Sequence, residues 1–358
     1  MVEPFIVDLL DDGLRTPFFV LDLAAVDTAV AELRTAFSAP GRSLEIYYML
    51  KCNTIPALLK RLSQLGCGMS VSHDSEIELV RRHASRSSIL VGGPSVDGAL
   101  LQAAAPLDVR YVSLNTATAV SEWRQSGLRC EPLLRISSGP AGQKFGLDLS
   151  HLPHDIEALH SHAGTAVDPV TWNSLVAPLL SRDDQRKLKN VGGGFLGSTR
   201  LHSRGQALSD YAAALRSDAL TPDLLLEPGR YIAETAMTCA TTVTAVDGDR
   251  VYVDVGSNLL PPLLSADYRA VGVVGSDGEG ETRDYALYDC GCFGQRFLPS
   301  LRAARVSKGD VVMIENCGAY TFSLWSSFGA GPGQAVVVDS RAATLAQAPT
   351  SERHATLL

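Results

Sequence analysis

A lysine that directly follows an apolar, aromatic run is the first residue that could do chemistry. Lys51 ends the segment YYMLK at 47–51, in a chain that has only six lysines against 25 arginines. A lysine at the end of a buried strand is expected to be partly desolvated, which lowers its pKa and frees the amine for imine formation. The alternative is a strand-end lysine whose charge simply reaches solvent, and position alone does not separate the two.

Two alternating histidines stand in the segment HSHAGT at 160–165. His160 and His162 would share one face of a strand, and two such histidines could bind a metal ion. No third ligand follows at a suitable spacing, and no HExxH or CxxC motif accompanies them, so we predict no metal site. His162 is better explained as an imidazole that packs flat against a planar ligand, with Gly164 and Thr165 offering an amide and a hydroxyl.

The glycine-rich segment GGGFLG at 192–197 formally matches GxGxxG, which is a weak signal on its own. A dinucleotide-binding fold needs an acid at the end of a second strand about 20 residues later, but Asp210 lies in a helix-like stretch. Glycines also let backbone amides approach an anion closely, so Gly193 and Gly194 are predicted to belong to a phosphate site. A glycine turn without a ligand is the alternative.

A carboxylate and further backbone amides follow in the segment LLLEPGR at 224–230. Glu227 ends this apolar run, as Lys51 ends the first one. Gly229 and Arg230 can offer additional amides to a phosphate group. The pattern therefore predicts an amine, a carboxylate and an anion site at the ends of different strands.

Eight short apolar runs recur between about residue 45 and residue 230, each followed by a polar turn and a helix-like segment. They are EIYYML (45–50), GMSVS (68–72), SSILVG (87–92), RYVSL (110–114), PLLRI (132–136), EALHSH (157–162), LKNVG (188–192) and DLLLE (223–227). Alternating strand and helix units predict an α/β fold with a (β/α)8 TIM-type barrel. Active sites of such barrels lie at the carboxyl ends of the strands, where the candidate residues stand.

The pattern changes after residue 235. The segment MTCATTVTAVDGDRVYVDVG indicates two strands joined by an Asp-Gly turn, and β-like runs continue after it. We predict a barrel over residues 20–235 and an antiparallel β-sandwich or β-barrel domain over 236–345, on which residues 1–19 pack. Cys292 in DCGCFGQRF and Tyr320 in ENCGAYTF fall in this second domain, where each, taken alone, would be structural.

Composition excludes several classes of protein. The chain has 358 residues with 31 basic and 39 acidic side chains, a net charge of −8, and 46% of its residues are hydrophobic. The acidic balance argues against nucleic-acid or anionic-membrane partners, and no apolar run is long enough to span a bilayer. The acidic first residues do not resemble a signal peptide, and seven cysteines without framework spacing indicate free thiols. We therefore expect a cytoplasmic protein.

Taken together, these motifs resemble the fold-type III pyridoxal-phosphate enzymes, specifically the ornithine/diaminopimelate decarboxylase family. YYMLKCN is similar to the family's YAVKAN or FAVKCN, HSHAGT to HFHVGS, and GAYTF to its counterpart, while GGGF and LEPGR are unchanged. The resemblance runs from about residue 17 to residue 339. Each motif is weak alone, but five in the family order at matching spacing form a strong signal.

The resemblance implies a role for each candidate residue. Lys51 would hold pyridoxal phosphate as an aldimine, and Glu227 would pair with the pyridine nitrogen, so that the ring acts as an electron sink. His162 would stack on the ring. The residues implied to bind the phosphate or other parts of the cofactor are Thr165, Gly193, Gly194, Gly229, Arg230, Tyr320 and Arg135.

The resemblance also implies a head-to-tail homodimer with two shared sites. Cys292 would reach in from the second subunit and protonate the carbanion left by the departing CO2. Cys290 is an alternative, because the register is uncertain by two residues.

The segments that would bind the substrate depart from the family. The family's proton-donor segment is Cys-Asp/Glu-x-x-Asp, whose first acid binds the distal amine of a diamino acid, but here Phe293 and Arg296 occupy the acid positions. No acid follows Cys290 either. Ser70 stands where the family commonly has an acid, and NLLPPLLS at 258–265 has proline where diaminopimelate decarboxylases supply an arginine.

These departures predict a decarboxylase of a specialised biosynthetic pathway that acts on a non-diamine amino acid, carboxylate-bearing or conjugated, with Phe293 and Arg296 as specificity residues. A racemase of the alanine racemase type is the alternative, although those racemases place an arginine where Glu227 stands. A catalytically inactive regulator of a decarboxylase is a third possibility, but it predicts the loss of Lys51 or of the phosphate site, and both are kept.

Overall fold

The computed structural model of the chain describes residues 2–137, 145–148, 152–180, 187–216, 220–275, 280–292, 296, 298–328, 334–341, 344–345 and 355–356. The chain divides into two compact units. One unit comprises residues 28–231, and the other combines residues 1–27 with residues 232–358. The amino-terminal segment therefore belongs with the carboxyl-terminal part of the chain.

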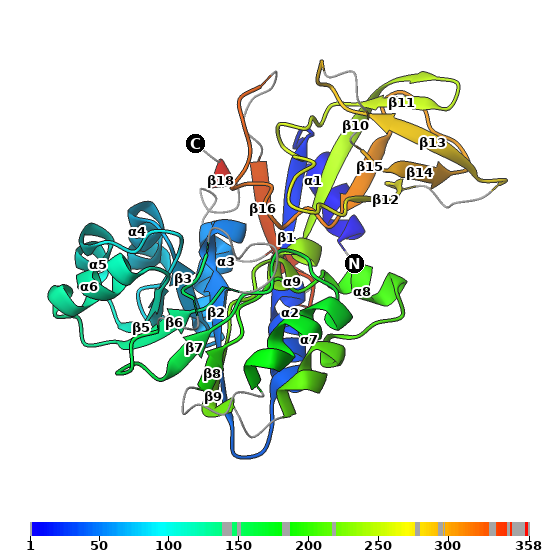
Figure 1. The fold of residues 1–358 in the computed structure, drawn as a ribbon. Coiled ribbons are helices and arrows are strands. Elements are labelled where there is room, and N and C mark those ends of the chain that lie inside the picture. The colour runs from blue at the N-terminus through cyan, green and yellow to red at the C-terminus, as the bar shows by residue number, and fades with distance from the viewer. Residues whose placement is uncertain are drawn as a thin grey trace. The chain divides into compact units, whose positions relative to one another are not determined.

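The first unit is built around a closed barrel of eight parallel strands in sequential order (Figure 1). The strands are β2 (Ser43–Met49), β3 (Gly68–Val71), β4 (Ile89–Val91), β5 (Val109–Leu114), β6 (Glu131–Arg135), β7 (Ala158–His160), β8 (Lys187–Asn190) and β9 (Leu220–Leu226). Pairing of β2 with β9 closes the barrel. Each strand falls on one of the eight apolar runs, so the predicted TIM-type barrel is confirmed.

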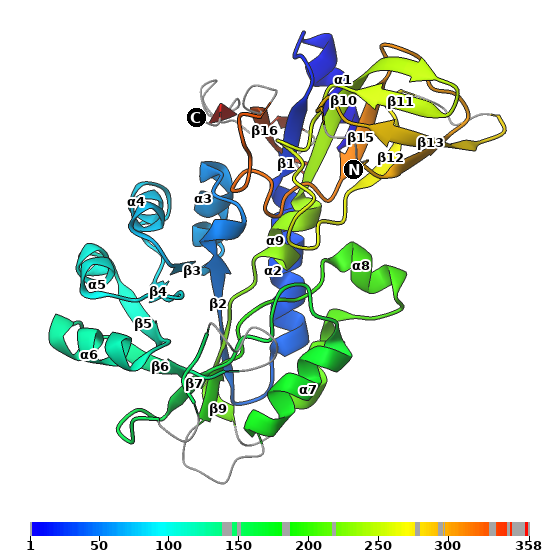
Figure 2. The ribbon, with the colours of Figure 1, turned by 45° about the horizontal axis from the view of Figure 1, so that its top comes forward.

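Helices precede, connect and follow the strands of this unit. They are α2 (Leu23–Phe37), α3 (Pro56–Gln64), α4 (Asp74–His83), α5 (Gly98–Ala104), α6 (Ala117–Ser126), α7 (Pro169–Leu180), α8 (Ser198–Ser203), α9 (Arg230–Ala233) and the 3-10 helices η1 (Leu50–Cys52) and η4 (Leu208–Arg216). Figures 1 and 2 show α3 to α6 following one another around the outside of the barrel.

Local capping explains where several of these helices begin. Asp97 accepts a hydrogen bond from the Leu100 amide at the start of α5, and Thr116 accepts one from the Ala119 amide at the start of α6. Pro56 occupies the first turn of α3, where its missing N–H costs nothing. The strand-to-helix turns at the carboxyl end of the barrel are therefore fixed by local chemistry.

The amino-terminal end of the barrel interior is filled by side chains. Tyr47, Tyr111 and Leu225 belong to a buried cluster that also includes Leu90 and Leu133. Beside this cluster, the Lys189 ammonium lies 2.7 Å from the Glu131 carboxylate and 5.0 Å from the centre of the Tyr111 ring. A packed interior at this end leaves the carboxyl-terminal mouth as the place for a ligand.

The second unit is a mostly antiparallel sheet. Its strands are β1 (Phe18–Asp22), β10 (Met237–Asp247), β11 (Arg250–Val253), β12 (Arg269–Val273), β13 (Arg283–Tyr288), β14 (Ser300–Ala303), β15 (Val311–Glu315), β16 (Gln334–Asp339), β17 (Thr344–Leu345) and β18 (Ala355–Thr356). β10 and β11 form the predicted hairpin. β1 lies between β10 and β16, and helix α1 (Glu3–Asp11) packs its apolar residues on this sheet. The predicted combination of a barrel with an antiparallel β domain is confirmed.

No helix in the described ranges is long and apolar enough to cross a membrane.

Candidate active site

A cavity of about 230 Å³ opens at the carboxyl-terminal mouth of the barrel. Its wall combines an amine, a carboxylate, a guanidinium group and two imidazoles. The residues that line it are Met49, Lys51, Ser70, Val71, Ser72, Gly92, Gly93, Pro94, Arg135, Phe145, His160, His162, Gly164, Thr165 and Glu227. The structure thus brings together, in one cavity, Lys51, Arg135, His162, Thr165 and Glu227, which the sequence singled out separately.

Lys51 lies in η1, the single turn that directly follows β2. Its side chain lines the cavity but is exposed to solvent. The partial desolvation expected from the sequence was therefore wrong, because the turn carries the lysine past the buried end of the strand. Access from solvent leaves the amine open to a carbonyl compound that enters the cavity.

Glu227 also lines the cavity, immediately after β9, the strand that pairs with β2, and only 5% of its surface is exposed. The Ser70 hydroxyl donates to its Oε2 at 2.6 Å, and the Asn190 side-chain amide donates to its Oε1 at 2.8 Å. The Nε2 atom of His160 lies 3.2 Å from the same Oε1. Three residues on β3, β7 and β8 therefore surround one carboxylate.

His160 is 3% exposed, and its two ring nitrogens have different neighbours. The Ser113 hydroxyl lies 2.6 Å from Nδ1, a hydrogen-bond distance. Nε2 makes no hydrogen bond of good geometry within the described ranges, although it approaches Glu227. Burial, together with the nearby Arg135 charge, holds the pKa of His160 well below its usual 6.5.

His162 lies two residues further on and also lines the cavity. The Gly193 amide donates to its Nδ1 at 3.3 Å, which requires an unprotonated nitrogen. Burial lowers the pKa of His162 below its usual 6.5, with Arg135 adding to the effect and Glu227 opposing it. A neutral imidazole at the cavity wall suits packing against a planar ligand.

The glycine loops pack backbone against backbone. A Cβ atom on Gly193 would lie 2.1 Å from the Glu227 carbonyl oxygen, and one on Gly194 would lie 2.0 Å from the Gly164 carbonyl oxygen. Gly194 also has a φ of 80°, in the left-handed region that favours glycine. Glycine is thus required here by the close approach of the loops after β7, β8 and β9. Phosphate binding by Gly193 and Gly194 stays a prediction.

Tyr211 in η4 joins two of these loops. Its hydroxyl donates to the Val167 carbonyl at 2.6 Å and accepts from the Leu196 amide at 3.0 Å. The ring packs on Phe195 and Trp172. This buried aromatic cluster therefore links the residues that directly follow the HAGT and GGGF segments.

The last predicted segment of the barrel unit, LEPGR, is equally tight. A Cβ atom on Gly229 would lie 2.9 Å from Cβ of Cys52, the residue after Lys51. Arg230 begins α9 and is buried. Neither residue lines the cavity, so their predicted contact with a phosphate stays a prediction.

Several residues at this mouth were missed by sequence reasoning. Asn190 ends β8 and Ser113 lies one residue before the end of β5, so their strand-end positions could have indicated them. Phe145 covers Arg135, whose guanidinium carbon lies 4.3 Å from the centre of the ring. Burial lowers the pKa of Arg135, and the Glu227 charge acts in the opposite direction.

The remaining predicted site residues belong to the second unit. Cys292 and Cys290 are both exposed, while Tyr320 has a φ of 61°, which is uncommon for a residue other than glycine. Arg296 is exposed and donates to the Ser300 hydroxyl at 2.9 Å. Phe293 lies outside the described residues.

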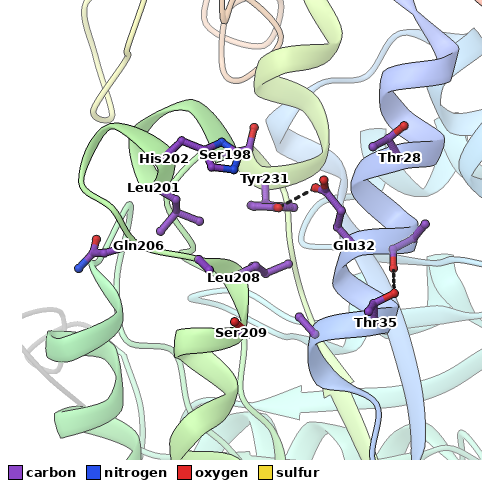
Figure 3. Close-up of a pocket in the computed structure, with 13 residues that line it drawn as sticks. Thr28, Glu32, Thr35, Ser198, Leu201, His202, Gln206, Leu208, Ser209 and Tyr231 are labelled. Carbon is purple, nitrogen blue, oxygen red and sulfur yellow. Dashed lines mark hydrogen bonds between the residues drawn. The ribbon is translucent and has the colours of Figure 1, made fainter.

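A second cavity, of about 590 Å³, lies outside the barrel between α2, α8 and η4 (Figure 3). Glu32 and Tyr231 face each other across it, and the Tyr231 hydroxyl donates to Glu32 at 2.7 Å. None of the residues predicted from the sequence to form the site lines this larger cavity.

Comparison with known proteins agrees with this geometry. Residues 23–165 match the family model described as the pyridoxal binding domain of pyridoxal-dependent decarboxylases. The resemblance to the fold-type III pyridoxal-phosphate-dependent decarboxylases that the motifs predicted is thereby confirmed. It is 26% identical to diaminopimelate decarboxylase of Methanothermobacter thermautotrophicus over 92% of this chain and 88% of that protein. It is 24% identical to human antizyme inhibitor 2 over 87% of this chain and 78% of that protein.

Solved structures show the same fold. Arginine decarboxylase of Paramecium bursaria Chlorella virus superposes with a TM-score of 0.77 at 21% identity, over 95% of this chain and all of that chain. At this identity the match concerns the fold alone.

The residues of the cavity fit pyridoxal phosphate, the cofactor of this family. Lys51 offers a primary amine, and Glu227 offers a buried carboxylate that still has acceptor capacity for a ring nitrogen. The buried Nε2 of His160, without a well-formed hydrogen bond of its own, lies beside that carboxylate. Within the described part of the chain, no group of three or more metal-ligating side chains is present.

The buried imidazoles predict a loss of stability in acid. Their folded-state pKa values lie below 6.5, so the unfolded chain binds more protons below that pH, and stability falls as the pH falls. Each such group contributes a slope of at most about 1.4 kcal/mol per pH unit. The free energy of unfolding, measured by urea titration at several pH values between about pH 5 and pH 7, should fall less steeply with falling pH for His162→Gln than for the wild type.

The exposed His202 of α8 provides the matched control. His202→Gln should retain the wild-type slope. Equal slopes for the wild type and His162→Gln would show that His162 is not held neutral by the fold.

Proposed function

We propose that the chain catalyses the decarboxylation of an amino acid with pyridoxal phosphate held on Lys51. The observation that carries the proposal is the arrangement of the Lys51 amine and the buried Glu227 carboxylate on one cavity. Bound pyridoxal phosphate supplies an electron sink for the electron pair left when the α-carboxylate departs as CO2. The protein residues bind and orient the cofactor and control its protonation.

Glu227 keeps the pyridine nitrogen protonated in this proposal. The side chains that contact it are a hydroxyl, an amide and an imidazole whose pKa is held low, so none of them neutralises the carboxylate charge. A full negative charge beside the ring nitrogen favours the protonated ring. This is the reverse of a racemase that places an arginine there, and no observation favours the racemase alternative.

The other cofactor contacts extend the same proposal. His162 packs against the ring as a neutral imidazole, and Arg135 lies at the same cavity. Thr165, Gly193, Gly194, Gly229, Arg230 and Tyr320 bind the phosphate. The Gly193 amide already donates to His162, which supports an indirect part for it, through the orientation of the imidazole.

Cys292, from a second subunit, is the proposed proton donor to the α-carbon. Cys290 is the weaker candidate, because its sulfur packs near Gly256 and partial burial raises its thiol pKa. This assignment requires a homodimer with shared sites.

The substrate is proposed to carry a carboxylate or a neutral polar group at its far end, free or conjugated. Support comes from the sequence, since no acid follows Cys292 in the segment that ends at Arg296. The hydrogen bond of Arg296 to Ser300 gives this arginine a partner within its own segment, so the structure adds no support for its contact with substrate.

The cofactor site can be tested by reduction with borohydride. Protein supplied with pyridoxal phosphate should be yellow, and borohydride should fix the cofactor on the peptide that contains Lys51. Lys51→Ala should be colourless and retain no decarboxylase activity. Lys60→Ala, which removes an exposed lysine of α3, should behave as the wild type. A wild type that takes up no cofactor would contradict the proposal.

Shared sites can be tested by mixing two inactive variants. Lys51→Ala subunits and Cys292→Ala subunits should regain part of the wild-type activity when mixed, because a heterodimer then contains one intact site. Mass spectrometry of the intact assembly checks that subunits exchange. Exchange without recovered activity would show that the sites are not shared or that Cys292 is not the donor.

Substrate class can be tested by CO2 release from ornithine, lysine, diaminopimelate, glutamate and a citryl conjugate of a diamino acid. An unpaired distal amine in a desolvated pocket should reduce kcat/KM by roughly a hundredfold or more, so the carboxylate-bearing compounds should be preferred. Arg296→Ala should lower that preference. Efficient turnover of ornithine or lysine, unchanged in Arg296→Ala, would contradict this part of the proposal.

A further inference from the structure

The carboxylate of Glu227 has more acceptor positions than the described residues fill with hydrogen bonds. A carboxylate offers about four lone-pair sites. Hydrogen bonds from Ser70 and Asn190 occupy two of these sites. His160 Nε2 lies 3.2 Å from Oε1 without forming a hydrogen bond to it. Acceptor capacity is therefore left for a donor that enters the cavity, which Glu227 lines.

The position of the proton on His160 follows from its two neighbours. A carboxylate can only accept hydrogen bonds. The nitrogen that faces Glu227 must therefore carry the hydrogen, because otherwise its own lone pair would face the lone pairs of the carboxylate oxygen. The Ser113 hydroxyl can rotate and donate, and it lies 2.6 Å from Nδ1. Only one assignment satisfies both contacts. Ser113 O–H donates to Nδ1, and Nε2 carries the hydrogen 3.2 Å from Oε1 of Glu227, outside hydrogen-bond geometry.

We infer that Ser113 and His160 are positioning residues for Glu227. The Ser113 hydroxyl fixes His160 as its Nε2–H tautomer, and this tautomer orients the carboxylate towards the ring nitrogen of the bound cofactor. The inference rests on the proposed function, because Glu227 is the group through which both residues act. Ser113 lies on β5 and His160 on β7, so the chain of contacts crosses the interior of the barrel mouth.

The charge of His160 matters as much as its tautomer. A protonated imidazole would neutralise Glu227 and compete with the ring nitrogen for it. The charged or titratable groups that face this region are Arg135, Glu227, His162 and Lys51. Arg135 disfavours a second positive charge beside it, and burial at 3% exposure acts in the same direction. The fold therefore keeps His160 neutral beside a charged carboxylate.

Nitrogen-15 NMR of the full-length protein, labelled on histidine, reports the tautomer directly. The His160 signals are assigned by their loss in His160→Gln. The wild type should show the neutral Nε2–H form, both with and without added pyridoxal phosphate. Ser113→Ala should lose this preference. Ser88→Ala is the matched control, because Ser88 is also at a barrel strand but donates to Tyr47, away from Glu227.

Steady-state kinetics separate positioning from general stability. Loss of either positioning residue should lower kcat about tenfold while KM changes less than about twofold, in Ser113→Ala and in His160→Leu. His160→Gln can still present an N–H group to Glu227 and should recover most of the lost kcat. Ser88→Ala should leave kcat unchanged. If His160→Leu does not fold, Ser113→Ala still decides the inference.

Borohydride trapping keeps the two proposals apart. One possible outcome is that borohydride traps the cofactor on Lys51 in both the wild type and Ser113→Ala, while the His160 tautomer and kcat are unchanged in the variant. This outcome would overturn the inference and leave the proposed function intact. An Nδ1–H or protonated His160 in the wild type would also overturn it. Failure of the wild type to bind cofactor would overturn the proposed function and, with it, the positioning of Glu227 towards a ring nitrogen.

Discussion

The buried carboxylate of Glu227 is the constraint on which the barrel mouth depends. A carboxylate with 5% of its surface exposed must be compensated by hydrogen bonds, since an uncompensated buried charge costs several kcal/mol or more. Compensation comes from Ser70 and Asn190, with His160 close by. These residues lie on three different strands, so a shift in the register of β3 or β8 would remove one of the two hydrogen bonds to the carboxylate.

Close backbone packing is the second constraint at the same mouth. The loops after β7, β8 and β9 approach so closely that Gly193 and Gly194 have no room for a Cβ atom. The Glu227 amide donates to the Gly192 carbonyl at 2.8 Å, which places the carboxylate directly on this packed layer. The position of Glu227 is thus determined from both sides, by donors to its side chain and by contacts to its backbone.

Features that depend on neighbouring residues could be predicted from the sequence. The eight barrel strands follow from apolar runs, and the β10–β11 hairpin follows from its Asp-Gly turn. Lys51 and Glu227 could be selected because each directly follows such a run. Glycine at 192–194 was recognised, but its main structural reason was not, because the backbone that excludes a side chain there comes from other loops.

Features that depend on distant parts of the chain could not be predicted in this way. Ser113 and Asn190 are ordinary residues in their own strands, and only barrel closure brings them to His160 and Glu227. The exposure of Lys51 depends on a single turn after β2, which apolar patterning does not describe. Arg296 could be identified as a departure from the family, but its hydrogen bond to Ser300 depends on the local path of the chain.

The departures from the family take different forms in the two units. In the barrel unit, Ser70 replaces an acid, yet its hydroxyl donates to Glu227, so the change turns a repulsive neighbour into a supporting one. In the second unit, Phe293 and Arg296 stand at positions where the resemblance implies acids, the first of which would bind a distal amine. A change of the first kind adds a hydrogen-bond donor to the buried carboxylate. A change of the second kind is proposed to alter which substrates are bound, and it leaves the donors around Glu227 in place, since these belong to the barrel unit.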